Sequence, residues 1–328
     1  MRKGKRWLAA AVSAAMIVQS LASVGPVYAA DDGVSIADTF TDSSFRSYVS
    51  SNFDTDSNGY LSDAEISNVT SIDVSKCSPA ISSLNGVELF TNLSKLDCNE
   101  QSIRNLDIEN LENLEYIDVS SNRIDSLTLP VSAEKLTYLD ISGNKITSLT
   151  SLADYNNLVL LNANSTNLSS IDVSNMKGLK VLGVSGTTIS TLDLGSNMEL
   201  TTLYCDSMRS LPVLDVSGHE KLKNLYCAGA KSDSGVVVRS SITKLDVSGD
   251  IVLGSLDCSN SYVAELNIDN TPALTTLDCS NTRLTSIDVS KNTSLSYLDV
   301  SSNVLGAVDF TANTALRELY VKDTGINK

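Results

Sequence analysis

Twelve residues near the N-terminus have the types and spacing of a loop that binds a divalent cation. Asp54, Asp56, Asn58, Gly59 and Glu65 stand at the five specified positions of the pattern D-x-[DN]-x-[DN]-G-x5-E. Calcium prefers oxygen ligands, and this spacing of carboxylate and amide groups is that of an EF-hand loop. We therefore predict one Ca2+ site with six ligand residues: Asp54, Asp56, Asn58, Tyr60 through its carbonyl, Ser62 through a water, and Glu65 with both oxygens.

A helix must enter this loop and a second helix must leave it. Phe45, Tyr48 and Val49 recur at helical spacing and predict the entering helix. The leaving helix must be short, because a strand-like segment follows almost at once. We expect residues 31–68 to form this helix-loop-helix module, and we find no second loop of this kind. Single sites of this type in extracellular modules have dissociation constants on the order of 10⁻⁴–10⁻³ M, and an affinity in that range suits a structural clip that caps the next element.

The rest of the chain repeats one pattern about every 21 residues. Residues 274–284 and 295–305 both follow L-x-x-L-x-L-x-x-N-x-L, with threonine in place of asparagine in the first. Only the step from Leu222 to Leu253 is longer, because the polar stretch near 231–241 is inserted there. The pattern is that of leucine-rich repeats and predicts about twelve units over residues 69–328. An irregular copy begins at Val69, and regular copies begin at Leu93, Leu114, Leu136, Leu158, Leu179, Leu200, Leu222, Leu253, Leu274, Leu295 and Leu316.

Each unit predicts a short strand followed by a return segment. The L-x-L alternation directs leucines inward and the intervening residues to an exposed, concave sheet face. The return segments carry two apolar residues around one polar residue, as in Ile171-Asp-Val173, and are too short for a full helix. We expect a leucine-rich-repeat solenoid of the α/β horseshoe class that is mostly β, with little helix outside its N-terminal cap.

Several side chains on the expected concave face are candidate ligand contacts. Tyrosine is a typical contact residue on exposed sheets, although strands also favour tyrosine for their own stability. Aspartates recur in register on the same face and form a ladder, whereas catalytic acids usually occupy distinguishable environments. The candidate ligand-binding residues are Tyr116, Tyr138, Tyr204, Tyr226, Tyr297 and Tyr320.

The cysteines and the one histidine do not predict an active site. Five of the six cysteines fall on the inward L-x-C position, where parallel neighbours are poorly placed to form disulfides, so we expect free, buried thiols. His219 stands where other repeats have Asn197 and Asn292, and no G-x-S-x-G motif accompanies it. We expect no enzymatic activity.

The first 30 residues predict a secretory signal peptide. Arg2, Lys3, Lys5 and Arg6 precede an apolar run and a Val-Tyr-Ala cleavage site at 27–29. Net charge is −15, from 24 basic and 39 acidic residues; loss of the four leader charges leaves 20 basic residues and a charge of −19. Such acidity disfavours nucleic acid as a partner. We expect an extracellular protein, free or at the cell surface, without a transmembrane span in the mature chain.

Four stretches together resemble a known bacterial family: 45–48, the loop 54–65, 69–75 and 84–93, followed by L-x-x-L-D-C-S units such as the one at Leu274. They resemble secreted leucine-rich-repeat proteins of Gram-positive bacteria that open with an EF-hand-type module, and more distantly internalin-type adhesins. The resemblance implies a secreted or surface binding protein whose concave face holds a protein or glycan. The alternative is a structural wall or matrix component that self-associates through its C-terminal edge.

Overall fold

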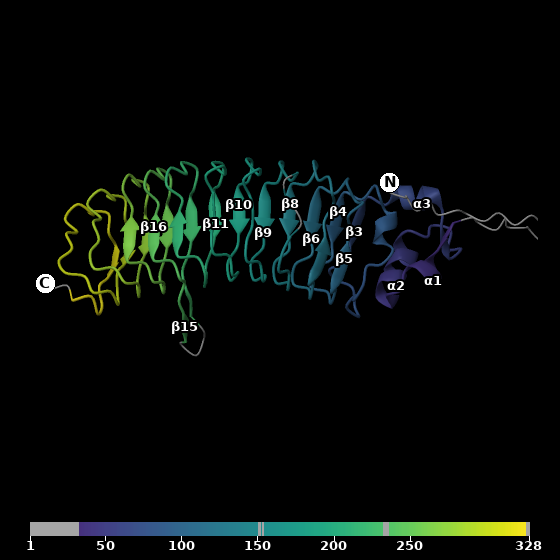
Figure 1. The fold of residues 1–328 in the computed structure, drawn as a ribbon, viewed down its shortest axis with the longest axis horizontal. Helices are drawn as coiled ribbons and strands as arrows, with labels where there is room; N and C mark the ends of the chain where they lie inside the picture. The colour runs from purple at the N-terminus through teal and green to yellow at the C-terminus, as the bar shows by residue number, and fades with distance from the viewer. Residues whose placement is uncertain (1–32, 150–151, 153, 232–235, 326–328) are drawn as a thin grey trace, which may run out of the picture. The chain divides into compact units, whose positions relative to one another are not determined.

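Twelve short parallel strands form the main sheet of the computed structural model, which describes residues 33–149, 152, 154–231 and 236–325. The leader predicted at 1–30 lies outside these residues. Figure 1 shows the strands following one another along the chain. In sheet order they are β3 (Ser71–Asp73), β4 (Lys95–Asp97), β6 (Tyr116–Asp118), β8 (Tyr138–Asp140), β9 (Leu160–Asn162), β10 (Val181–Gly183), β11 (Thr202–Tyr204), β13 (Asn224–Tyr226), β17 (Ser255–Asp257), β19 (Thr276–Asp278), β20 (Tyr297–Asp299) and β21 (Glu318–Tyr320).

Equivalent residues of neighbouring repeats pair in register. Leu277 pairs with Leu256 on one side and with Leu298 on the other, and all three are fully buried. The first and third residues of each strand point to the opposite, outer face. These middle leucines form one continuous core, so the predicted solenoid of about twelve turns, mostly β, is confirmed.

Buried asparagines end the strands where the repeat pattern places them. Asn122 donates from Nδ2 to the carbonyl oxygens of Cys98 and Val119, and its Oδ1 accepts from the N–H of Ile103. Ser121, just before it, has a left-handed φ of 54°. The side chain therefore satisfies backbone groups that the turn would otherwise leave unpaired.

The return segments form strands in only some units. On this side β5 (Asn105–Asp107) pairs with β7 (Ser126–Thr128), and β12 (Val213–Asp215), β16 (Lys244–Asp246) and β18 (Glu265–Asn267) form a second small sheet. The equivalent segments 171–173, 192–194, 287–289 and 308–310 are not strands, although their sequences have the same pattern. The extended return segment expected in each repeat thus forms a strand in five of the repeats.

The insertion after β13 folds into a hairpin that leaves the main sheet uninterrupted. Strand β14 (Ala230–Lys231) pairs antiparallel with β15 (Val237–Val238), and Figure 1 shows this hairpin standing out from the row of strands. Strands β13 and β17 still pair directly across the insertion.

Short helices precede the first repeat. They are α1 (Ile36–Thr39), α2 (Ser43–Asn52) and α3 (Asp63–Asn68), with the 3₁₀ turn η1 (Val87–Leu89) further on. Two strands of two residues, β1 (Val34–Ser35) and β2 (Tyr60–Leu61), pair antiparallel. Within the described ranges, none of the helices has the length and apolar character needed to cross a membrane.

Candidate metal centre and exposed sheet face

The predicted calcium loop lies between α2 and α3, with β2 inside it. Asp42 caps the start of α2 by accepting from the N–H groups of Ser44 and Phe45. Helix α3 starts with a capping box, in which the Ser62 hydroxyl accepts from the N–H of Glu65 and the Glu65 carboxylate accepts from the N–H of Ser62. The capping box therefore holds the loop at its junction with α3, whereas Asp42 caps α2 at the end away from the loop.

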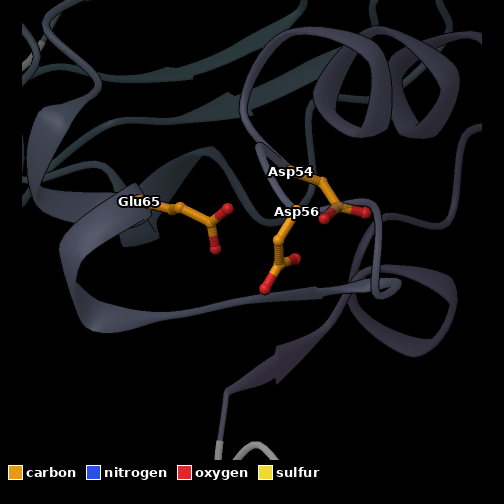
Figure 2. A group of neighbouring side chains, drawn as sticks. All are labelled: Asp54, Asp56 and Glu65. Carbon is orange, nitrogen blue, oxygen red and sulfur yellow. The ribbon is translucent and has the colours of Figure 1, made fainter.

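Three carboxylates converge inside this loop. The ligand oxygens of Asp54, Asp56 and Glu65 all lie within 4.8 Å of one another. Figure 2 shows Glu65 reaching from α3 towards the two aspartates. No lysine or arginine of the described chain forms an ion pair with any of the three. Three negative groups this close repel one another, so the donor set fits a hard divalent cation.

Backbone and hydroxyl donors hold the carboxylates in place. Asp54 accepts from the N–H of Asn58 at 3.1 Å and from that of Gly59 at 3.0 Å. Glu65 accepts from the Thr55 hydroxyl at 2.7 Å and from the Ser62 hydroxyl at 2.8 Å. The bonds from Thr55, followed by those from Ser62, lower the pKa of Glu65 to about 2. Glu65 is therefore ionised at neutral pH.

The other three predicted ligand residues lie around this cluster. Asn58 donates from Nδ2 to Oδ2 of Asp56 at 3.0 Å, and its Oδ1 accepts from the N–H of Tyr60. The Tyr60 side chain is exposed, whereas the Ser62 hydroxyl is used in the capping box with Glu65. The structure thus brings the three carboxylates together, with Asn58 bonded to Asp54 and Asp56 and with Ser62 bonded to Glu65.

A pairing that the sequence did not reveal anchors the loop. Strand β2 pairs with β1, and the N–H of Ile36 donates to the carbonyl of Gly59 at 3.1 Å. A Cβ on Gly33 would lie 2.7 Å from the carbonyl oxygen of Leu61, so glycine permits this close approach. The residues just before α1 thereby occupy the edge of the loop.

Aromatic rings join this module to the first repeat. Phe40 packs edge-on against Phe45 and is stacked on Phe90, with centroids 5.4 and 6.0 Å apart. Phe53 also contacts Phe90. The three rings of Phe40, Phe45 and Phe90 are fully buried and belong to the same core as the leucines of the sheet.

The six candidate tyrosines all lie on the outer face of the main sheet, in three neighbouring pairs. Tyr116 and Tyr138 stack with centroids 4.2 Å apart, and Tyr204 and Tyr226 stack at 5.0 Å with an angle of 5° between the rings. Tyr297 and Tyr320 are tilted at 45°. Burial, with nearby aspartates, raises the pKa of Tyr297 to about 12, so the Tyr297 hydroxyl remains neutral at physiological pH.

The third residues of the twelve strands form a line across the sheet, which we call the third-position row. From β3 to β21 the row reads Asp73, Asp97, Asp118, Asp140, Asn162, Gly183, Tyr204, Tyr226, Asp257, Asp278, Asp299 and Tyr320. The aspartate ladder expected from the sequence is therefore a physical row, which Asn162, Gly183 and the pair Tyr204 and Tyr226 interrupt at mid-sheet.

The five cysteines at the inward position are buried as predicted, and His219, for which no burial was predicted, is buried as well. Cys205, Cys227, Cys258 and Cys279 directly follow four neighbouring strands, are fully buried and are unbridged. Burial raises the pKa of the Cys279 thiol well above its ordinary range, so it is a poor nucleophile. His219 is buried, with its ring nitrogens 2.7 and 3.2 Å from the carbonyl oxygens of Val216 and Leu194.

Comparison with known protein families identifies the repeats. The model described as "Leucine Rich repeats (2 copies)" matches residues 112–154, and the model described as "Leucine Rich repeat" matches residues 291–309. A search of curated protein sequences finds no match.

Solved structures with a similar fold include two internalins. The functional domain of InlJ from Listeria monocytogenes, which includes a cysteine ladder, is 25% identical with a TM-score of 0.58, covering 90% of this chain and 72% of that one. The internalin InlF from L. monocytogenes strain 4b F2365 is 18% identical with a TM-score of 0.61, covering 90% and 93%. YopM, a leucine-rich effector protein from Yersinia pestis, is 20% identical with a TM-score of 0.58, covering 70% and 61%.

The chain is thus a leucine-rich-repeat protein with internalin-like structural neighbours. Solenoids of this kind are typical of proteins that bind other proteins through an extended repeat surface.

Proposed function

We propose that this protein is a secreted or surface-held binding protein that presents the outer face of its main sheet to a protein or glycan. One structural Ca2+ would complete its N-terminal cap. The observation that carries the proposal is the stacked pair Tyr204–Tyr226, which replaces the aspartates at the centre of the third-position row.

The pair is accessible from solvent. Tyr204 is 37% exposed and Tyr226 is half-buried, so each ring offers an edge and a hydroxyl group to a partner. Rings held by mutual stacking lose little conformational entropy on binding, and tyrosines are enriched among residues that dominate binding energy.

Binding screens against proteins and glycans, with Ca2+ present, would test this function. A ligand found in this way should bind the variant Tyr204→Ala/Tyr226→Ala at least about tenfold more weakly, as for a pair of contact residues. The variant Tyr116→Ala/Tyr138→Ala removes the other parallel stacked pair and shows whether the ligand also contacts the first half of the sheet. Unchanged affinity in the Tyr204/Tyr226 variant would refute the assigned face.

The calcium proposal is supported by the convergence of Asp54, Asp56 and Glu65 without a cationic partner. A bound ion would relieve the repulsion among these carboxylates and lock the loop against β1. Isothermal titration calorimetry should detect one site, and thermal melts should show a higher melting temperature with Ca2+ than with chelator. Identical melts would argue strongly against a structural ion.

A second candidate function, self-association, is favoured by the apolar surface of β21. Leu319 is 41% exposed, whereas its register partner Leu298 is fully buried. Light scattering over a range of concentrations would separate the two functions. A rise in mass that Leu319→Ser abolishes would support self-association, and a constant monomer mass would support the binding protein.

A further inference from the structure

One lysine shows how a cation is held on the third-position row. The Nζ of Lys95 lies 3.8 Å from Oδ2 of Asp73 and 3.7 Å from Oδ2 of Asp97. It also lies over the ring of Tyr116, 5.1 Å from the centroid. An ammonium group thus sits between the carboxylates of adjacent strands and against a tyrosine of the next strand.

The other aspartates in this half of the row also have partners for their second oxygen. Oδ2 of Asp118 accepts from Nδ2 of Asn99 at 3.3 Å. Oδ2 of Asp140 accepts from Nδ2 of Asn162 at 2.8 Å. Each of these four carboxylates therefore has either an ion pair or an amide hydrogen bond at Oδ2 within the chain itself.

The three aspartates on β17, β19 and β20 differ. Oδ1 of each accepts from the N–H of a serine two residues later, at 2.8–2.9 Å. Oδ2 of each forms no ion pair and accepts from no side-chain amide in the described part of the chain. The three residues are Asp257, Asp278 and Asp299, and all are partly exposed.

The difference has a simple cause in the sequence. The positions equivalent to Lys95, at the start of each strand, hold Ser255, Thr276 and Tyr297. The positions equivalent to Asn99 hold serines instead of asparagines. Neither the cation nor the amide that compensates the first half of the row is present in the second half.

Tyrosines stand at both ends of this uncompensated stretch. Tyr226 precedes Asp257 in the row and Tyr320 follows Asp299. Burial, together with repulsion from Asp257 and Asp299, raises the pKa of Asp278, although the hydrogen bonds from Ser280 act in the opposite direction. An incoming positive charge would remove that repulsion.

We infer that Asp257, Asp278 and Asp299, flanked by Tyr226 and Tyr320, bind lysine or arginine side chains on an extended segment of a protein partner. The inference rests on the proposed function and names the chemistry of the partner at that face. The net charge of −15 favours a basic partner, and carboxylates beside aromatic rings match the charge and the flat face of a guanidinium group.

A metal ion fits this stretch less well than a basic side chain. Within the described residues, the only acidic or thiol cluster with ligand atoms close enough for one ion is that of Asp54, Asp56 and Glu65. The carboxylates of the row belong to separate strands about 4.8 Å apart, a spacing that repeats along a line and does not close around a point.

The test uses the full mature chain with Ca2+ present and a short peptide of alternating arginine and serine as the probe. A peptide with citrulline in place of arginine serves as the neutral comparison. The variant Asp257→Asn/Asp278→Asn/Asp299→Asn should bind the arginine peptide about tenfold more weakly, and the wild type should lose affinity as salt rises.

The control variant carries the same charge change on the return side, as Asp193→Asn/Asp288→Asn/Asp309→Asn. Each of these aspartates also accepts from a backbone N–H two residues later, so the local bonding is matched. The control should change affinity less than about twofold, because exposed charges beyond a Debye length are screened.

Equal losses in the two variants would overturn the inference, since they would reflect net charge alone. Equal binding of the arginine and citrulline peptides would also overturn it. A natural partner whose affinity depends on Tyr204 and Tyr226 but not on the three aspartates would refute the inference that these aspartates bind basic side chains. The proposed function would then still hold. Loss of the tyrosine dependence would instead count against the proposed function.

Discussion

The hydroxyl of Tyr48 accepts a hydrogen bond from the backbone N–H of Asp73 at 3.2 Å. Tyr48 belongs to α2, and Asp73 ends β3, the first strand of the main sheet. An edge strand leaves backbone groups without a strand partner, and this bond satisfies one of them. The N-terminal module is therefore joined to the solenoid by a polar contact as well as by its buried phenylalanines.

Removal of this hydroxyl should weaken the junction. Tyr48→Phe is expected to lower the free energy of unfolding by about 1 kcal/mol, because the N–H of Asp73 loses its acceptor while the ring still packs. Urea unfolding followed by circular dichroism measures the change. Tyr60→Phe is the control, since that side chain is exposed; equal effects of the two changes would contradict the assigned role.

Calcium binding should depend on Glu65 and not on its neighbour. Glu65→Gln removes one of the three converging carboxylates and is expected to weaken Ca2+ binding by more than about tenfold and to abolish the rise in melting temperature. Asp63→Asn is the matched control, because Asp63 is an exposed acid on the same helix. Calorimetry on both variants checks this. Wild-type Ca2+ affinity and a wild-type rise in melting temperature in Glu65→Gln would refute the proposed site.

Stability should fall as the pH rises because of Asp250. Burial raises the pKa of this carboxyl from 3.8 to about 8, and its Oδ2 has no hydrogen-bond partner, whereas Oδ1 accepts from the N–H of His219 at 2.8 Å. The folded state thus binds the proton more tightly than the unfolded state. The stability that this proton contributes is complete below about pH 3.8 and is lost as pH rises towards 8.

Replacing the carboxyl with an amide tests that linkage. Asp250→Asn keeps an acceptor for His219 and cannot ionise, so it should stabilise the protein by about 1–3 kcal/mol at neutral pH, with the gain shrinking as pH falls. Urea denaturation midpoints of the wild type and the variant, measured between about pH 4 and about pH 8, report this gain in stability, because that range spans the ordinary and the raised pKa of the carboxyl. A gain independent of pH would show that ionisation is not the cause.

The turn asparagines should matter more than exposed ones. Asn122→Ala removes bonds to the carbonyls of Cys98 and Val119 and to the N–H of Ile103, all buried, and should cost about 2–4 kcal/mol. Asn113→Ala removes only two exposed bonds, one to the carbonyl of Thr91 and one from Nζ of Lys135, and should cost less than about 1 kcal/mol. Chemical denaturation of both variants gives the comparison, and similar costs would contradict the buried role.

The repeat register was predictable because each unit carries the same inward leucines. Leu256, Leu277 and Leu298 can be aligned by eye, and their alignment alone predicts parallel, in-register strands. The three converging carboxylates were predicted as ligands from spacing in the same way. Periodicity and motif spacing are local properties, so the sequence displays them directly.

Other features depend on contacts between distant residues and were not predictable. The pairing of Val34 with Leu61 joins two-residue strands with no pattern of their own. Whether a return segment becomes a strand is not visible in its own sequence, since Leu214-Asp-Val216 and Leu192-Asp-Leu194 look alike and only the first contributes a strand. That Asp278 has neither an ion pair nor a side-chain amide partner became visible only once the neighbours of each strand were known.

In-register pairing also sets equivalent residues of the main sheet at a fixed spacing from one repeat to the next. Tyr226 and Tyr320 stand four strands apart in the third-position row, and each strand adds about 4.8 Å, so roughly 19 Å separates their backbones. Excision of residues 274–294 would remove one repeat and shorten the distance between the two tyrosine backbones to roughly 14 Å, with both tyrosines retained. The length of a bound segment could then be matched to a chosen number of repeats. Each added or removed repeat would change the segment length that fits by one strand spacing.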